Sequence, residues 1–327
     1  MPRKRDFFHT GLDVSRSECY HARNHNMALY GNVYHVCQKA NTGVWSALTE
    51  RFNEDQRYTN DDSLILHTDI QSALDATVAN REDYVYVHTD GSDYDLTASL
   101  TMSKKGVHLL APGGLSHGGG IPGNAVRLHQ TTAGLACMTS TADCIEMAGF
   151  FCKGMIDSPI VDLSGTRWHN YIHHNFLGGA VTAGAAIYTI TGAGAVFQCT
   201  ISDNYIMGGY SPNAAQTISG LIGFTSGSSG RNLIARNYLV TGARITVTAG
   251  VVTGGTNDMV VDNIFHETVA TVLTAGTFTE AWNGSTTTVY IGNKVAMDTP
   301  AESGGTVNNT HVDNWSATVG STILEAS

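Results

Sequence analysis

The sequence predicts an all-β protein that winds into a right-handed parallel β-helix, a solenoid of stacked coils. Three observations support this fold class: short β-forming runs recur along the second half of the chain, each run holds one Asn, and successive copies of this Asn are 21 to 33 residues apart. Repeats of this length, with one strand–bend–strand unit per copy, are typical of solenoids. The six recurring asparagines are Asn175, Asn204, Asn237, Asn263, Asn293 and Asn314.

Each of these asparagines is expected to form the bend of one coil. Asn tolerates the left-handed backbone region (φ > 0), so one such residue turns the chain sharply between two short strands. Gly106 and Gly149 are expected to form the bends of two earlier coils. The 43 residues between these two glycines exceed one coil, and residues 112–124 hold six Gly and two Pro, which predicts a loop outside the stack.

The composition excludes several classes of protein. Only 14% of the 327 residues are charged, against about 25% in ordinary soluble domains. After residue 153 only five Lys or Arg remain, so the repeats have no basic stripe for nucleic acid. Residues 168–202 carry no Asp, Glu, Lys or Arg, but Gly, Thr and Asn interrupt them, which argues against a membrane span. No apolar stretch follows the basic N-terminus, so no secretory signal is expected.

Three segments are expected along the chain. Residues 1–67 form an N-terminal arm without repeats, residues 68–317 form the β-helix, and residues 318–327 form a terminal strand or tail. Within the arm, residues 12–20 and 45–52 could each hold a short helix. The arm is also rich in aromatic side chains, which either pack back on the solenoid or dock on a partner. The aromatic residues expected at the docking site are Phe7, Phe8, Tyr20, Tyr30, Tyr34 and Trp45.

A helix is expected over residues 68–80, at the start of the solenoid. Thr68 is the expected N-cap, Gln71 completes a capping box, and Ile70, Ala73, Leu74 and Val78 form one apolar stripe. Strands are expected over residues 84–88, 96–102 and 107–110.

The residues of this region resemble the start of pectin-lyase-like β-helix domains. The resemblance rests on Asp69–Asp75, Tyr84–Val87, Tyr94–Leu96 and Leu100–Leu109, and it extends to about residue 315. It implies that the helix plugs the open N-terminal end of the solenoid, where unpaired backbone groups would otherwise be exposed. The resemblance is specific for the fold rather than for an activity.

The same resemblance raises an enzymatic alternative. β-Helix lyases use an Asp cluster that binds calcium together with an Arg base, and β-helix hydrolases use two or three Asp on adjacent coils. Asp203, Asp262 and Asp313 each precede a bend Asn and could share one edge of the solenoid. Asp beside Asn is also favourable turn chemistry, and Arg236 takes the same place on the coil between Asp203 and Asp262. No catalytic residue is therefore predicted, and these three Asp remain the alternative.

No metal or other cofactor is expected. His169 and His173 would point to one side of a strand and could begin a zinc or nickel site, but no Cys or acid stands beside them in the sequence. The six cysteines form no CxxC pair, which favours buried free thiols.

A plugged β-helix, a surface rich in Thr, Ser and Asn, and an aromatic arm together resemble virion surface proteins of tailed bacteriophages. The resemblance implies a non-enzymatic decoration or fibre protein of the virion, made in the host cytoplasm, usually as a homotrimer docked on a capsid or tail protein. Outward Ile, Val and Thr in residues 245–252 and 269–273 would favour packing of parallel copies. Two alternatives stay open: a polysaccharide-degrading enzyme, and a module that binds a host-surface glycan through Trp168, Tyr205 and Tyr238.

Overall fold

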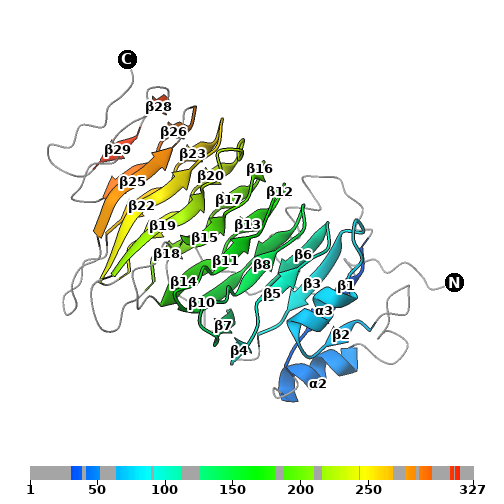
Figure 1. Cartoon of the computed structure of the whole chain (residues 1–327). Helices are drawn as coiled ribbons and strands as arrows, with labels where there is room; N and C mark the ends of the chain where they lie inside the picture. Colours follow the sequence, from blue (N-terminus) through cyan, green and yellow to red (C-terminus); the bar gives the residue numbers. More distant parts are fainter. Residues whose placement is uncertain are drawn as a thin grey trace.

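The computed structural model of the chain is a column of stacked coils whose strands run parallel (Figure 1). It describes residues 31–38, 42–51, 64–89, 92–111, 125–180, 188–209, 216–242, 244–267, 277–284, 287–296, 310–312 and 314–316. Helices α2 and α3 lie at the N-terminal end of the column, and strands β28 and β29 lie at the other end (Figure 1). The predicted parallel β-helix is confirmed.

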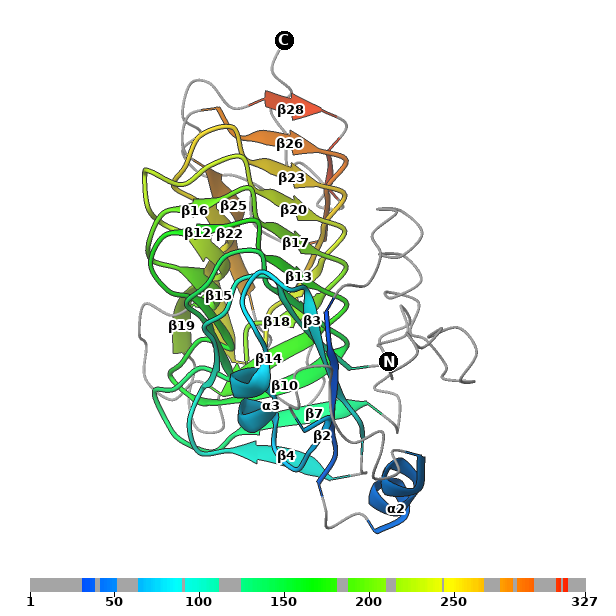
Figure 2. The ribbon, with the colours of Figure 1, turned by 90° about the vertical axis from the view of Figure 1, so that its right-hand side faces the viewer.

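Three long sheets form the walls of the column. The first sheet contains, in spatial order, β2 (Leu66–His67), β1 (Val33–Val36), β3 (Asp83–Val87), β6 (Val107–Leu110), β9 (Glu146–Ala148), β13 (Tyr171–His173), β17 (Thr200–Ser202), β20 (Leu233–Ala235), β23 (Met259–Val261), β26 (Val289–Ile291) and β28 (Thr310–Val312). Figure 2 shows the later strands of this sheet stacked one above another.

From β3 to β23, each first-sheet strand is followed along the chain by a strand of the second sheet and then by a strand of the third sheet. The second sheet contains β29 (Trp315–Ser316), β27 (Lys294–Ala296), β24 (Ile264–His266), β21 (Tyr238–Val240), β18 (Tyr205–Met207), β14 (Phe176–Ala180), β10 (Phe150–Ile156), β7 (Val126–Gln130) and β4 (Asp93–Leu96). The third sheet contains β25 (Thr277–Gly284), β22 (Ile245–Thr253), β19 (Gln216–Phe224), β15 (Tyr188–Gly192), β11 (Val161–Leu163), β8 (Met138–Ser140) and β5 (Leu100–Met102). A short pair, β12 (Arg167–Trp168) and β16 (Val196–Phe197), precedes the first sheet on two coils.

The core fills the inside of the column with one layer of apolar side chains per coil. The middle residues of successive first-sheet strands pair in register and are fully buried; they are Ile172, Ile201, Ile234, Val260 and Tyr290. Burial of these side chains in a continuous stack is the main stabilising contribution, at about 1.5–3 kcal/mol for each large apolar side chain.

The recurring asparagines stack along one edge of the column, at the corner between the first and second sheets. The backbone N–H and the Nδ2 of Asn204 both donate to Oδ1 of Asn237, at 3.1 and 3.0 Å. Nδ2 of Asn204 also donates to the carbonyl of Ile172 on the preceding coil, at 2.9 Å. The same set of bonds repeats on the other coils, and its members are Asn175, Asn204, Asn237, Asn263, Asn293 and Asn314. We call this row the asparagine ladder.

The left-handed residue at each of these corners is not the Asn, so that prediction is wrong. Positive φ occurs one residue earlier, at His174, Asp203, Arg236, Asp262 and Gly292, with values between 53° and 63°. The preceding residue turns the chain, while the Asn faces inward and bonds the coils together.

Of the two predicted glycine bends, Gly149 lies at the asparagine corner and Gly106 does not. Gly149 (φ 88°) aligns with His174 through the register of β9 and β13, and Phe150 N–H donates to Oδ1 of Asn175. Gly106 (φ 71°) also turns the chain, but it precedes β6 and aligns with Cys144 at the opposite end of the first sheet. Its predicted place among the asparagine corners is therefore wrong.

Helix α3 (Ile70–Ala76) plugs the first coil, but it is shorter than predicted. Its N-cap is Asp69 rather than Thr68, since the Asp69 side chain accepts from the N–H of Ser72 at 2.8 Å. Ile70, Ala73 and Leu74 are buried, whereas Val78 lies beyond the helix with 44% of its surface exposed. The predicted strand over residues 96–102 is divided into the end of β4 and β5.

Part of the predicted arm belongs to the solenoid. Strand β1 pairs with β3 and β2 pairs with β1, so the first sheet begins well before the predicted boundary at residue 67. Tyr34 is fully buried, and its hydroxyl donates to the carbonyl of Ala76, so its predicted role in partner docking is wrong. Trp45, on α2 (Thr42–Arg51), is partly buried and packs against Cys37, Leu48 and Leu66.

Several predictions fall on residues outside the described ranges. These are the docking aromatics Phe7, Phe8, Tyr20 and Tyr30, the helix over residues 12–20, the loop over residues 112–124, the carboxylate of Asp313 and the tail at residues 318–327.

The outer face of the third sheet is hydroxyl-rich rather than apolar. Ile245, Val247 and Val251 on β22 are fully buried, whereas Thr246 is half-buried and Thr248 is exposed. Of the predicted outward Ile, Val and Thr of residues 245–252, the threonines and the half-buried Val252 face outward, whereas Ile245, Val247 and Val251 do not. Residues 269–273 lie outside the described ranges.

We predict that Asn237→Ala lowers the free energy of unfolding by about 3 kcal/mol or more, because it leaves buried amides of the neighbouring coils without partners. Thr248→Ala, at an exposed position on β22, is the control and should cost about 1 kcal/mol or less. Urea unfolding followed by circular dichroism measures both. Equal losses in the two variants would mean that the ladder does not stabilise the column.

Candidate functional site

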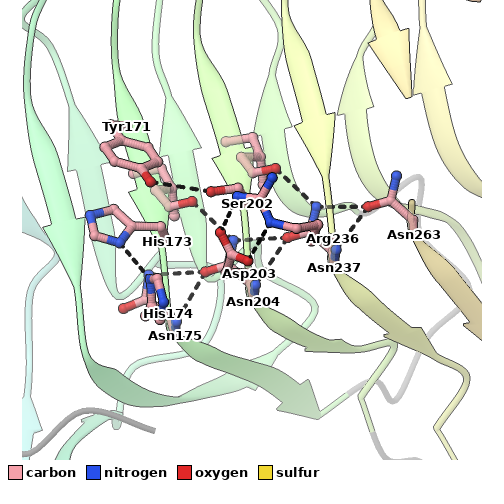
Figure 3. A network of polar contacts seen from close by, with 12 residues as sticks. Tyr171, His173, His174, Asn175, Ser202, Asp203, Asn204, Arg236, Asn237 and Asn263 are labelled. Atoms are coloured by element: carbon pink, nitrogen blue, oxygen red, sulfur yellow. Dashed lines mark hydrogen bonds and ion pairs between the residues drawn. The ribbon is translucent and has the colours of Figure 1, made fainter. Parts of the chain in front are cut away.

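The corner residues that precede the asparagine ladder carry the charged groups of this edge. Figure 3 shows His174, Asp203 and Arg236 beside the ladder, each on a neighbouring coil. Arg236 donates from Nε to Oδ1 of Asp203 at 2.8 Å and from Nη2 to Oδ2 at 2.6 Å. This two-point contact joins adjacent coils on the outside of the corner, while the asparagines join them on the inside.

The ion pair holds Asp203 in its charged form. Burial alone would raise the pKa of Asp203, but hydrogen bonds from Arg236 and Ser202 outweigh it, so the pKa lies below its ordinary value of 3.8. The Asp203 side chain is 9% exposed and the Arg236 side chain 57% exposed. Asp203 is therefore an ionised, largely covered carboxylate.

Asp203 and Asp262 lie on the same corner, as predicted, but they are not arranged as a catalytic pair. They are two strand spacings apart, or about 10 Å, and Arg236 occupies the one coil between them. Glycoside hydrolysis needs one carboxyl with a raised pKa as the acid. The pKa of Asp203 is lowered instead.

One half-buried carboxyl on another wall does have a raised pKa. Burial raises the pKa of Asp162 above its ordinary value, and Arg167 opposes that effect. Asp162 pairs in register with Thr139 and Thr191 on the neighbouring strands of the third sheet. No second acid stands beside it on those two described strands, so it lacks the partner carboxylate that hydrolysis requires.

A chain of acids and histidines lies on the outer face of the first sheet, and its members His108, Glu146 and His173 are buried. His108 contacts Oε2 of Glu146 through Nδ1 at 2.6 Å and Oε2 of Glu82 through Nε2 at 2.9 Å. The other oxygen of Glu146 contacts Nε2 of His173 at 2.7 Å, and Nδ1 of His173 lies 2.8 Å from Nδ1 of His174. Each of the first four residues comes from a different coil, so we call them, with His174, the His–Glu row.

Two tyrosine rings complete this row. Tyr84 stacks on His108 with ring centroids 4.3 Å apart, and Tyr171 stacks on His173 at 3.8 Å. Burial opposes protonation of His108, but hydrogen bonds and charges from Glu146 and Glu82 raise its pKa to about 9. His108 is therefore a buried cation between two carboxylates, which binds three coils together.

The two histidines of the metal alternative, His169 and His173, do not lie together. His169 is exposed at the corner before β13 (φ 56°), whereas His173 is buried at the end of that strand, so the two do not share one side. Within the described ranges no group of three or more His, Cys, Asp or Glu is arranged to hold a metal ion. Four described cysteines are buried and Cys144 is partly buried, all as free thiols, as predicted.

The three aromatic residues predicted to bind a glycan do not form one groove. Trp168 lies on β12 before the first sheet, whereas Tyr205 and Tyr238 lie on the second sheet beyond the asparagine corner. Tyr205 and Tyr238 belong to a stack of half-buried rings that also includes Phe151 and Phe176, with centroids 4.6 to 5.2 Å apart. Because these rings cover each other's faces, the stack stabilises the coils and offers mainly ring edges to a ligand.

A second polar row was missed by the sequence analysis. It lies at the other end of the first sheet, where Asn170, Cys199 and Asn232 accept from the backbone N–H of the preceding coil at 3.0 to 3.3 Å. The sequence signal was a constant offset: each member stands five residues before a corner of the asparagine ladder. We call it the second ladder, and its members are Asn170, Cys199, Asn232 and Asp258.

Comparisons with known proteins give little beyond the fold. No described protein family and no curated protein matches the sequence. Among solved structures, the chain is similar to ORF18 of Geobacillus virus E2, with 13% identity and a TM-score of 0.46 over 74% of this chain. The match spans 46% of the ORF18 chain, and at this level it carries no argument about function. Among the described residues no helix is long and apolar enough to cross a membrane.

We predict a coupling below about 1 kcal/mol between Asp203 and Arg236, because Arg236 is exposed. The lowered pKa of Asp203 means that this contribution is complete above about pH 4 and is lost as the pH falls further. A double-mutant cycle with Asp203→Asn and Arg236→Met, measured by urea unfolding at pH 7 and pH 3, tests this. A coupling that is the same at pH 3 as at pH 7 would contradict the assignment.

We predict that His108 stabilises the N-terminal coils by at most about 3 kcal/mol, corresponding to the rise of its pKa from 6.5 to about 9. Because the folded pKa is the higher one, this stabilisation is complete below pH 6.5 and is lost as the pH rises through 9. The difference in unfolding free energy between wild type and His108→Gln should therefore shrink between pH 6.5 and 9.5. His129→Gln, which replaces a more exposed histidine on β7, is the control for the loss of an imidazole ring and should cost less than His108→Gln at pH 6.5.

Proposed function

We propose that this chain is a non-enzymatic structural protein of a tailed-phage virion, of the decoration or fibre type. In this proposal the β-helix projects from the particle as a stiff column, and the N-terminal region attaches it to a capsid or tail protein. The assignment to a phage particle rests on the resemblance in sequence character described above, since the structural match to the Geobacillus virus protein is too weak to support it.

The non-enzymatic part of the proposal is supported by the ion pair that Asp203 forms with Arg236. The best candidate for a catalytic carboxylate is bound at two points by Arg236 and has a lowered pKa. Glu146, the most buried acid of the His–Glu row, is likewise bound between His108 and His173. These acids bond neighbouring coils to one another, so we assign them a role in stabilising the column rather than in catalysis.

A homotrimer is also part of the proposal. The third sheet offers a flat outer face in which Thr217, Thr246 and Thr277 align across β19, β22 and β25. Parallel copies could pack these hydroxyl-rich walls about a common axis. Mass photometry of the purified chain measures this directly; a monomer at micromolar concentration would end the trimer proposal.

The virion proposal predicts that the chain is present in purified particles in a fixed ratio to the major capsid or tail protein. A full-length variant with Phe7→Ser and Phe8→Ser should have the same unfolding free energy as the wild type but fail to join particles that lack the chain. Quantitative mass spectrometry of the particles measures both.

Two results would overturn the proposal. One is the absence of the chain from particles. The other is release of sugar fragments from bacterial polysaccharides by the wild-type protein with loss of this activity in Asp203→Asn, which would establish the enzymatic alternative.

A further inference from the structure

The second ladder contains one acidic residue, Asp258, which has an oxygen without a hydrogen-bond partner among the described residues. Asp258 is fully buried and stands below Asn232, where its Oδ1 accepts from the backbone N–H of Asn232 at 2.8 Å and from Nδ2 at 3.0 Å. Its other oxygen, Oδ2, has no hydrogen-bond partner among the described residues. A carboxylate in this place leaves a buried charge with one oxygen unsatisfied, which is costly.

No cation at this corner compensates for that charge. The neighbouring groups are Arg231, Asn232 and Cys199 on the preceding coils, and Thr287 and Thr288 on the following coil. Arg231 is the charged one among them, and its side chain is exposed. No ion pair joins Asp258 to a described residue.

The rung above shows what the unsatisfied oxygen lacks. In Asn232, Oδ1 accepts from the preceding coil, and Nδ2 donates to the carbonyl of Val196, three residues before Cys199 on that coil. At Asp258 the equivalent acceptor is the carbonyl of Ser229, three residues before Asn232. A protonated carboxyl has the same shape as an amide and could donate to this carbonyl, whereas a carboxylate cannot.

We propose that Asp258 is a proton-dependent rung of the second ladder. With a proton on Oδ2 it completes the ladder as an asparagine would, and the coils that hold β20, β23 and β26 are firmly joined. Without the proton the rung is broken, and these coils are held less firmly. The C-terminal part of the column is therefore stiffer at mildly acidic pH than at pH 7.5.

The electrostatics of the site agree with this geometry. Burial raises the pKa of Asp258 from 3.8 to about 6, against the hydrogen bonds from Asn232 that favour the charged form. Because the folded pKa is the higher one, stability contributed by protonation is complete below about pH 4 and is lost as the pH rises through 6. The inference does not depend on the virion proposal, because it concerns the stability of the fold alone.

The test compares Asp258→Asn with wild type by urea unfolding at pH 4.5 and pH 7.5. The variant should be the more stable protein at pH 7.5, by about 100-fold in the folding equilibrium constant, which is the two-unit shift converted directly. The advantage should shrink at least about 10-fold at pH 4.5. Contributions from other titrating groups, including His108, cancel in the difference.

Asp262→Asn is the matched control, since Asp262 is exposed on the same coil. Its difference from wild type at pH 7.5 should be much smaller than that of Asp258→Asn, because its carboxyl is exposed. If Asp258→Asn does not fold, Asp258→Thr, which places the residue of the next coil at this rung, replaces it with the same expectation. In addition, infrared spectra of wild type at pH 5 should contain a carboxylic acid band that the variant lacks. An advantage that is equal at both pH values, or an unchanged infrared band, overturns the proposal.

Discussion

The structure depends on supplying hydrogen-bond partners to the backbone where each coil turns a corner. A turn at a left-handed residue takes the chain out of one sheet and into the next, and the following N–H would lose its place in a ladder of strands. Buried amides without partners are costly, and a solenoid repeats that cost on every coil. The asparagine ladder supplies these partners with one side chain per coil. Oδ1 of each Asn accepts from the backbone N–H and Nδ2 of the Asn on the coil before, and Nδ2 donates to a carbonyl of that same coil.

Because of this constraint, the Asn position admits one residue type, whereas the position before it admits several. The Asn faces inward and is buried on every described coil of the ladder, whereas the residue before it faces outward and varies among His, Asp, Arg and Gly. Chemistry on this edge would have to use the outward position. On this chain, Asp203 and Arg236 at that position bind each other, so the outer contact reinforces the inner one instead of leaving groups for a substrate.

The periodic part of the fold could be predicted from the sequence because the ladder imposes one residue type at a regular spacing. The backbone conformation could not, since the hydrogen-bond role and the left-handed role fall on adjacent residues and Asn is suited to both. The His–Glu row could not be predicted from the sequence either. His108 pairs with Glu146 across 38 residues, longer than any spacing of the recurring asparagines, so the register of these two strands has no sequence signal.

The two ladders show why one was visible in the sequence and the other was not. Each described rung of the asparagine ladder also donates from Nδ2 to a backbone carbonyl, as Asn263 does to Ile234 and Asn293 to Val260. That double requirement for an acceptor and a donor in one short side chain admits an amide and little else. In the second ladder, Cys199 accepts through Sγ and donates only to a carbonyl of its own coil, that of Phe197, and Asp258 has an acceptor alone, so the residue type varies. Regularity in a solenoid sequence therefore marks the corner where both functions are needed, and that corner fixes the register of the column.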